Sequence, residues 1–540
     1  MKKKLKINRL YFSTKLKFFL LLLVIVSYLY FTFYIFIPAY NRLGWHYPFG
    51  WDAPQYLSWI RYIIEKEYIH TLLNHRYPFG THLIVVILSS LTHIEPSIIL
   101  IFFPEICLLT YMLGISLLYY KARGNALSAG LVGAIIPYNF VIYYIFSALY
   151  QQFAYMSLLP LILYLVSSFV EKTSVYKLIS LIITVIIGWW LWPWGFIVTT
   201  WILLIPILLR DIKINIKIIF FCLATSLVLG HFIWQFNIYK VPFFEGLEAV
   251  SKTRPPYTFS IFLERAFNGS WMLLLFFCGG LLYNLVCLYH ENVTSKIITL
   301  YTIGIILGIV ASPFVEAKYR LTPFIPSYWL IIDFIVYVFL QKIPVLNKKK
   351  IKFQFKFFKY RFYSSTKFLF YVIAIILFLS GFAQLYFIEP STVQRHLWRR
   401  WLSVNDTSLI SSLQSIKEKI SQEEMGENFI IIVPFNYKYK SVDEVMLLNL
   451  YVKSFFPNSI MIYYGERSWN VSILIKYLHM NDAYIHPWCA ITMDGLTIDS
   501  FSVKGYQMVV LILREIFYVD NLPLDCIISL KKNGYGIIKL

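Results

Sequence analysis

Acids and cysteines are scarce in this chain of 540 residues. It holds 28 Asp and Glu against 49 Lys and Arg, and only 14% of its residues are charged. Apolar residues make up 59% of the chain, far more than a soluble globular domain uses, so the composition indicates a protein that crosses a membrane several times. The net charge of +21 does not indicate nucleic-acid binding, because most Lys and Arg residues stand in short segments between apolar runs, where membrane orientation requires them.

The six cysteines exclude a zinc site of the CxxC kind, since no two of them have that spacing. Two of them, Cys489 and Cys526, belong to the C-terminal part of the chain and could form one disulfide there. The other four stand in apolar runs, where we expect them to pack in the core: Cys107, Cys222, Cys278 and Cys287.

Apolar runs of membrane-spanning length predict about eleven transmembrane helices. The first run follows the basic N-terminus MKKKLKINR and is longer than the apolar core of a signal peptide, so we expect a retained span with a cytoplasmic N-terminus. The predicted spans are 18–38, 97–120, 127–146, 152–170, 177–193, 195–210, 216–236, 270–290, 296–313, 322–341 and 368–388. With this assignment the basic segments between spans fall on the cytoplasmic side, and the segment 343–367 is expected to touch anionic lipid headgroups there.

The stretch 44–82, GWHYPFGWDAPQYLSWIRYIIEKEYIHTLLNHRYPFGTH, is too polar to cross a bilayer and forms the first outer loop. Amphipathic patterns predict helices over 53–67 and 81–93, which we place on the outer leaflet as juxtamembrane helices. If 81–93 crossed the membrane, Lys121 and Arg123 would lie outside and every later loop would invert.

The composition changes after the eleventh span, and the chain divides into a transmembrane domain, 1–388, and a C-terminal domain, 389–540. Short apolar runs such as FIIIVPF, SIMIYYG and QMVVLI alternate there with helical patterns, which predicts a small α/β domain. An odd number of spans places this domain outside the cytoplasm. It has no Gly-rich phosphate loop and no catalytic constellation, so we expect a scaffolding or acceptor-docking role.

Asp52 is the first candidate for chemistry, since an acid after Gly-Trp at the mouth of a membrane bundle can act as a general base or bind a divalent cation. The alternative is that Asp52 is the N-cap of the helix that follows, with Pro54 just inside the helix. Both can hold, because capping uses one carboxylate oxygen.

Three further groups of polar residues lie in predicted outer loops. His75 could bind a metal and Arg76 a phosphate, or both could be interfacial residues at headgroup level. Lys318 and Arg320 precede the span at 322–341 and could hold a phosphate, or they could be snorkelling anchors. The loop 237–268 carries Glu245, Glu248 and Arg254, which could complete a metal shell or bind phosphate, or could simply be solvated. Ionisable residues also stand in or near apolar runs, where each calls for a functional hypothesis: Glu95, Glu105, His231 and Asp333.

This order of features resembles the GT-C class of integral-membrane glycosyltransferases, which includes oligosaccharyltransferases and protein O-mannosyltransferases. The resemblance covers roughly 1–390. It rests on the single span before an outer loop with two juxtamembrane helices, on the early Asp in GWDAPQYL, on HRYPFG at 75–80, and on KYRLTPFIP at 318–326.

The resemblance implies transfer of a sugar from a polyprenyl-phosphate donor to a glycan, lipid or protein acceptor at the outer face of the cell membrane. It implies Asp52 as the catalytic acid, Arg320 on the lipid phosphate, and a divalent metal (Mn or Mg) near His75. From their charge we expect Lys318 and Arg254 to bind the phosphate as well, and Glu245 and Glu248 to complete the metal shell. Substrate contacts are expected from His46, Trp51, Tyr56 and Arg76.

The chain departs from this pattern in the outer loop after the third span. Many members carry a second acid there, whereas this loop reads SALYQQ at 147–152 and has no carboxylate. We therefore expect transfer of a monosaccharide rather than of an oligosaccharide. Two alternatives stay open: a transporter or flippase of lipid-linked sugars, which would show an internal repeat, and a non-catalytic membrane scaffold.

Overall fold

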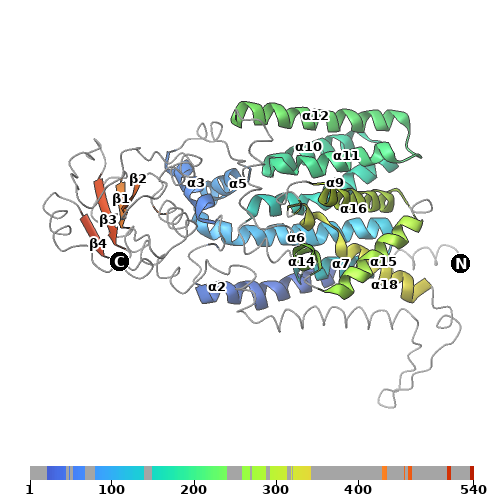
Figure 1. Ribbon diagram of the computed structural model, residues 1–540, viewed down its shortest axis with the longest axis horizontal. Helices are drawn as coiled ribbons and strands as arrows, with labels where there is room; N and C mark the ends of the chain where they lie inside the picture. The colour runs from blue at the N-terminus through green and yellow to red at the C-terminus, as the bar shows by residue number, and fades with distance from the viewer. Residues whose placement is uncertain are drawn as a thin grey trace, which may run out of the picture. The chain divides into compact units, whose positions relative to one another are not determined.

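Helices dominate the described part of the computed structural model (Figure 1). The structure describes residues 21–43, 48, 53–66, 80–138, 149–239, 258–267, 270–287, 292–312, 318, 320–341, 429–434, 455, 460–464, 507–512 and 536–539. The chain divides into two compact units: unit 1 holds Met1–Arg42, Asn74–Thr81 and Phe102–Val393, and unit 2 holds Leu43–Leu73, His82–Ile101 and Gln394–Leu540. The second unit therefore combines segments of the first outer loop with the C-terminal part of the chain.

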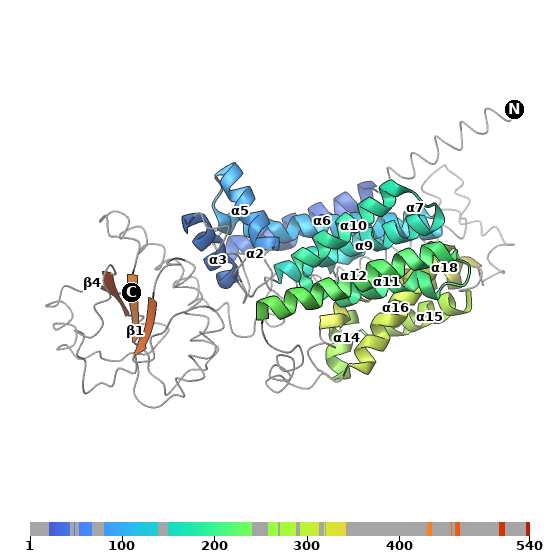
Figure 2. The same ribbon diagram turned by 90° about the horizontal axis from the view of Figure 1, so that it is seen from above.

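Unit 1 is a bundle of helices that lie side by side (Figures 1 and 2). A first helix runs over residues 21–43 and includes a π-helical turn, η1 (Thr32–Phe36), followed by α2 (Ile37–Leu43). The rest of the bundle comprises most of α6 (Pro96–Arg123), then α7 (Ala126–Ile135), η2 (Ile136–Tyr138), α9 (Tyr150–Glu171), α10 (Val175–Leu191), η3 (Pro193–Gly195), α11 (Phe196–Leu208), α12 (Ile214–Tyr239), α14 (Phe259–Phe267), α15 (Trp271–Cys287), α16 (Val293–Ala311), η4 (Thr322–Phe324) and α18 (Ser327–Gln341).

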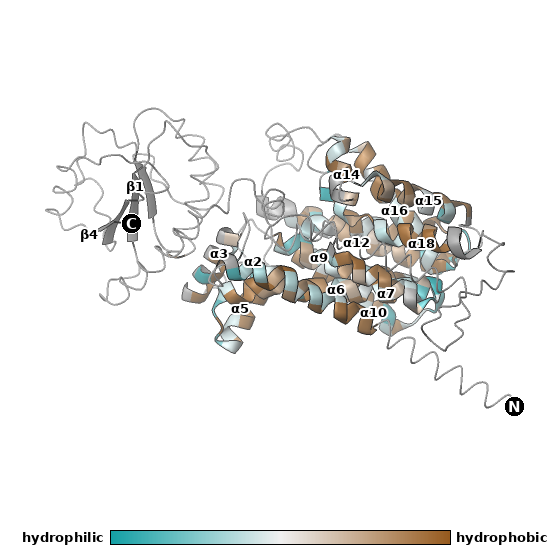
Figure 3. Ribbon diagram, turned by 90° about the horizontal axis from the view of Figure 1, so that it is seen from below, coloured by the Kyte–Doolittle hydropathy of each residue, from teal (hydrophilic) through white to brown (hydrophobic). Residues whose placement is uncertain are grey.

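The bundle helices are apolar over most of their surface (Figure 3), which suits a protein associated with a membrane. In the described part of the chain, four helices are long and apolar enough to cross a bilayer: Pro96–Arg123, Tyr150–Glu171, Ile214–Trp234 and Val293–Ala311. Helices also occupy the positions of the other predicted spans up to residue 341, although they are shorter. The predicted span 368–388 lies outside the described residues, so the count of eleven spans stays a prediction.

Close packing joins neighbouring helices in pairs, notably α9 with α10, α11 with α12 and α15 with α18. Gly280 allows the last of these contacts, because a Cβ atom at this position would overlap the backbone of Leu330. Helices can approach this closely only where a residue has no side chain at the point of contact. The glycine is therefore part of the reason that α15 and α18 lie together.

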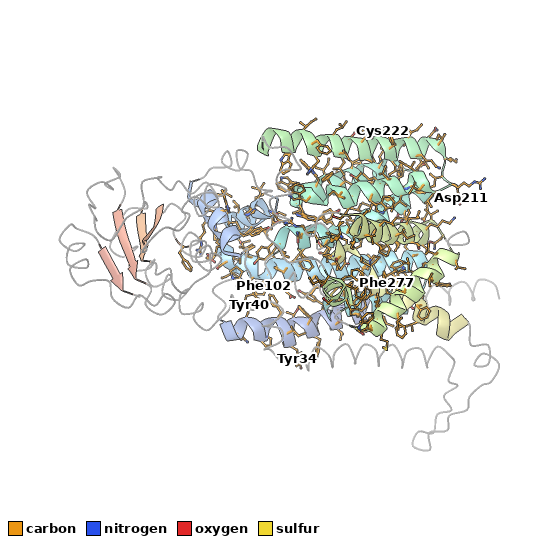
Figure 4. All side chains as sticks on the ribbon, in the orientation of Figure 1. Tyr34, Tyr40, Phe102, Asp211, Cys222 and Phe277 are labelled. Atoms are coloured by element: carbon orange, nitrogen blue, oxygen red, sulfur yellow. The ribbon has the colours of Figure 1, made fainter. Side chains whose placement is uncertain are left out.

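Basic residues from the segments predicted between spans lie at one end of the bundle. Lys121 of α6 forms an ion pair with Glu171 of α9 at 3.2 Å, and Lys296 of α16 forms one with Asp211 at 3.0 Å. The hydrogen bond from Lys296 lowers the pKa of the exposed Asp211, whose side chain points out of the bundle (Figure 4). The grouping agrees with the positive-inside pattern, while the orientation in the membrane stays a prediction.

Unit 2 contains the helices predicted for the first outer loop. The sequence predicted helices over 53–67 and 81–93, and the structure has α3 (Ala53–Lys66) and α5 (Gly80–Thr92), the first two residues of which belong to unit 1. The amphipathic repeat of α3 buries Leu57, Ile60 and Ile63 on one face. The helices are confirmed, whereas their place on the outer leaflet stays a prediction.

The described C-terminal residues include a parallel four-stranded sheet in the order β2-β1-β3-β4. Its strands are β1 (Phe429–Pro434), β2 (Ile460–Tyr464), β3 (Gln507–Ile512) and β4 (Gly536–Lys539). In the register Ile431 pairs with Met461 on one side and with Val509 on the other. Parallel strands require crossover connections, which are usually helical. The connecting segments lie outside the described residues, so the α/β character of this domain stays a prediction.

Candidate functional site

Most of the residues predicted to carry chemistry lie outside the described residues: His46, Trp51, Asp52, His75, Arg76, Glu245, Glu248 and Arg254. Three predicted residues are described, namely Tyr56 in α3 and the pair Lys318 and Arg320 before η4. Tyr56 belongs to unit 2, and Lys318 and Arg320 belong to unit 1, so the two groups are described separately.

Helix α3 begins at Ala53, so Asp52 occupies the position directly before the helix. Asp52 itself lies outside the described residues, so its role as the N-cap of α3 stays a prediction. One turn further on, the ring of Tyr56 stacks on His82 of α5, with centroids 4.4 Å apart and planes inclined by 6°. Both side chains are 2% exposed. The Tyr56 ring thus fixes the start of α3 against α5.

An ion pair that the sequence did not reveal ties α3 to the start of α6. Arg61 Nη2 lies 2.7 Å from Glu95 Oε1, and the other oxygen of Glu95 accepts a hydrogen bond of 2.7 Å from the backbone N–H of Ser97. The Arg61 guanidinium also lies 5.1 Å from the ring centroid of Phe455, in a cation–π arrangement. The sequence marks Arg61 only as one cation on an amphipathic helix, and no local pattern links it to Phe455.

Lys318 and Arg320 are half-exposed and stand just before the 3₁₀ turn η4. The backbone carbonyl of Lys318 accepts a hydrogen bond of 2.8 Å from the Thr322 hydroxyl, which fixes this cationic segment to the turn. The turn is held in its place by the buried Tyr301 of α16, whose hydroxyl donates to the backbone carbonyl of Phe324 at 2.8 Å.

A buried aromatic cluster, defined here as Tyr155, Trp192 and Phe324, joins η4 to the turn between α10 and α11. Phe324 stacks on Trp192 with centroids 5.7 Å apart and meets the Tyr155 ring edge-on at 5.8 Å. The Tyr155 hydroxyl donates to the carbonyl of Gly195 at 2.9 Å and lies 2.8 Å from the Thr199 hydroxyl. The WLWPWG turn at 190–195 and the KYRLTPFIP segment therefore form one structure.

The last residue of the HRYPFG motif reaches the same end of the bundle. A Cβ atom on Gly80 would lie 2.7 Å from the carbonyl oxygen of Trp190 and 2.9 Å from the Cα of Leu191. Both atoms belong to the backbone at the end of α10, which cannot move aside as a side chain could. Gly80, the 190–195 turn and the segment before η4 thus lie together at the end of α10 opposite to its Lys177.

We expect Gly80→Ala to destabilise the folded protein by about 1–3 kcal/mol, because the added methyl group must push the start of α5 away from α10. Gly230→Ala is the matched control, since a Cβ atom there meets nothing within 4 Å. Denaturant unfolding of both variants in the same detergent measures the difference. Equal stability of the two variants would contradict the close contact.

Metal binding gains no support from the described part of the chain. In those residues no group of three or more His, Cys, Asp or Glu side chains is close enough to hold a metal ion. The buried His231 instead stacks on Phe196 at 3.7 Å and accepts a hydrogen bond from Trp189 at 3.3 Å. The predicted metal ligands lie outside the described residues, so the metal stays a prediction.

In comparisons with known proteins, no protein-family model matches the chain, and no curated protein sequence matches it. A function for this chain is therefore argued from its architecture and from these contacts.

Proposed function

We propose that this protein is a membrane glycosyltransferase that moves a sugar from a polyprenyl-phosphate donor to a glycan, lipid or protein acceptor. The observation that carries the proposal is the meeting of Gly80, the 190–195 turn and the segment with Lys318 and Arg320 at one end of unit 1. Gly80 ends the HRYPFG motif, and Lys318 and Arg320 belong to KYRLTPFIP, two of the motifs on which the resemblance to GT-C enzymes rests; a third motif, GWDAPQYL, contains the first residues of α3.

The donor chemistry requires a positive charge near the phosphate. When the bond between the anomeric carbon and the phosphate oxygen breaks, the polyprenyl phosphate leaves with both bonding electrons and gains negative charge. Fixed cations stabilise that charge most when they are held before the reaction begins. Arg320 and Lys318 suit this role because Thr322 and the aromatic cluster fix their segment. Arg254 is proposed as a third cation.

The acceptor chemistry requires a base. A hydroxyl group of the acceptor attacks the anomeric carbon from the face opposite to the phosphate, which inverts the configuration, and its proton passes to the carboxylate of Asp52. One carbon–oxygen bond forms and one breaks, and the phosphate carries away the charge. No step requires a metal ion, and His75, Glu245 and Glu248 are proposed only as ligands of an accessory divalent cation.

The proposed topology follows from the basic end of the bundle. We place that end, with Lys121, Lys177 and Lys296, in the cytoplasm, and the end with Gly80 and Arg320 at the outer face. The N-terminus is then cytoplasmic, and the C-terminal domain extracytoplasmic. The contact between Arg61 of α3 and Phe455 supports a role for this domain near the first outer loop, where it would help to dock the acceptor.

The test uses purified full-length protein in lipid vesicles with a polyprenyl-phosphate hexose whose sugar is radiolabelled. Release of the sugar to water or its transfer to an added acceptor supports the proposal. Movement of intact donor between leaflets without cleavage would instead show a transporter. Neither cleavage nor movement would favour a scaffold.

In this assay we expect Arg320→Gln to lower turnover about a hundredfold, the scale of losing one preorganised donor to a developing negative charge. Arg320→Lys should recover part of the rate, because it keeps the charge and loses the bidentate geometry. Arg210→Gln is the control, an exposed arginine at the basic end of the bundle. Equal rates for the two Gln variants would remove Arg320 from the site.

A further inference from the structure

Glu105 is a buried acid that the proposed chemistry does not use. It lies in α6, one of the helices long and apolar enough to span the bilayer, and its residue exposure is 2%. It stands nine residues after Pro96, about 14 Å along the helix at 1.5 Å per residue, which places it in the hydrocarbon region of a span of this length. In the described part of the chain no Lys, Arg or His forms an ion pair with it.

The partner of Glu105 is the first residue of the π-helical turn. Thr32 Oγ1 lies 2.8 Å from Glu105 Oε2 and 3.0 Å from the backbone oxygen of Tyr28. The Tyr28 phenol interacts with the same carboxyl group and is the other titratable group beside it. This face of the first helix meets α6, as the ring contact between Phe36 and Phe102 at 6.2 Å shows, whereas Tyr34 points away from the bundle (Figure 4).

The Tyr28 phenol is also hydrogen-bonded to this carboxyl group, and the hydrogen atoms around Thr32 favour a protonated acid. Thr32 has one hydroxyl hydrogen, and the Tyr28 carbonyl can only accept a hydrogen bond. If Glu105 were ionised, two acceptors would compete for that single hydrogen. If Glu105 carries a proton on Oε2, it donates to Thr32, and Thr32 donates to Tyr28, so both short contacts are hydrogen bonds.

The second carboxyl oxygen leads to the same assignment. Oε1 of Glu105 is buried and has no hydrogen-bond partner. An unpartnered oxygen of a neutral acid is the carbonyl oxygen, which costs far less to bury than an oxygen that shares a negative charge. An ionised Glu105 would be an uncompensated charge in hydrocarbon.

We propose that Glu105 is a proton-binding site within the membrane, filled at neutral pH, and that its bound proton fixes η1 to α6 through Thr32. Loss of the proton would draw the Thr32 hydrogen from the Tyr28 carbonyl, one turn before η1, to the carboxylate. Such turns occur often at functional positions. The site does not depend on the glycosyltransferase proposal.

Two measurements on full-length protein in lipid vesicles at pH 7 test the site. The first is the infrared difference spectrum between wild type and Glu105→Gln. Exposed carboxyl groups ionise near pH 4, so we expect the wild type alone to show the carbonyl stretch of a protonated acid. Asp211→Asn, which changes an exposed acid, should keep that band.

The second measurement needs no variant and maps the products of dicyclohexylcarbodiimide, an apolar reagent that adds to protonated carboxyl groups. The acid proton moves to a nitrogen of the reagent while the carboxyl oxygen bonds to the central carbon. The acyl group then migrates to nitrogen, so the product has the summed mass of both reactants. We expect this adduct on Glu105 and not on Asp211. The proposal is overturned if the protonated-acid band is the same in the wild type and in Glu105→Gln. It is also overturned if the wild type shows no such band and Glu105 carries no adduct.

Discussion

Asp52→Asn is expected to lower the rate of sugar transfer by about 10²–10⁴-fold, the usual contribution of a positioned general base. The substitution separates the two roles proposed for Asp52, helix cap and general base. Asparagine caps a helix as well as aspartate does, so α3 should still begin at Ala53 and its stability should be unchanged. The amide cannot accept the proton of the acceptor hydroxyl, so we expect the rate of transfer to fall while the stability of the protein is unchanged. The measurement is turnover of the polyprenyl-phosphate hexose under saturating donor.

Two further variants complete this test. Asp52→Ala removes cap and base together, so we expect the same loss of rate and an added destabilisation of about 1 kcal/mol. Asp211→Asn makes the same chemical change at an exposed acid of the basic end and should leave turnover unaltered. A rate for Asp52→Asn equal to that of the wild type would remove Asp52 from the mechanism and leave it as a cap.

Asp333→Asn should lower the free energy of unfolding by about 3–5 kcal/mol, because it leaves the largely buried guanidinium of Arg123, whose side chain is 18% exposed, without its counter-ion. Asp333 is 3% exposed and lies between three helices. Its carboxylate accepts hydrogen bonds from the guanidinium of Arg123 at 3.1 Å, from the Tyr119 hydroxyl at 2.7 Å and from the Asn284 amide at 3.1 Å. Unfolding in detergent with increasing denaturant measures the loss.

The physical cause is tested by a variant that removes both charges. Replacing Arg123 with Met and Asp333 with Leu takes away the ion pair and the cost of burying it, so we expect the double variant to recover most of the stability. The exposed ion pair between Asp211 and Lys296 is the comparison, and Asp211→Asn should give no measurable change. An Asp333→Asn protein as stable as the wild type would show that Arg123 is solvated in the membrane.

Local patterns in the sequence were enough to place the helices. Apolar runs of the right length predicted the positions of α6, α9 and α16, and the amphipathic repeat after Asp52 predicted α3 nearly to the residue. The reason is that hydrophobic periodicity and capping act over a few neighbouring residues, and both are visible in the chain itself. The four described strands were foreseen in the same way, from short apolar runs bounded by polar segments.

The sequence did not predict which residues the polar side chains contact. The list of intramembrane acids contained Glu105 and Asp333 without any sign that one faces a threonine and the other an arginine. Likewise, the segment with Lys318 gave no hint of its link to Trp192, and HRYPFG gave none of its contact with Trp190. These pairs are far apart in the chain, and helix packing alone decides which side chains meet.

The sequence by itself therefore indicated a membrane-associated protein, the approximate positions of most of its described helices, and which residues to test for a chemical role; the short helix α14 lies in a stretch predicted as a loop. The tertiary structure decided which residues these side chains contact: Arg61 pairs with Glu95, Glu105 pairs with no described cation, and Gly80 and the segment before η4 meet the 190–195 turn at one end of α10. The physical reason is that hydrophobicity and capping are properties of a segment, whereas burial, ion pairing and proton occupancy are properties of an environment that many segments build together.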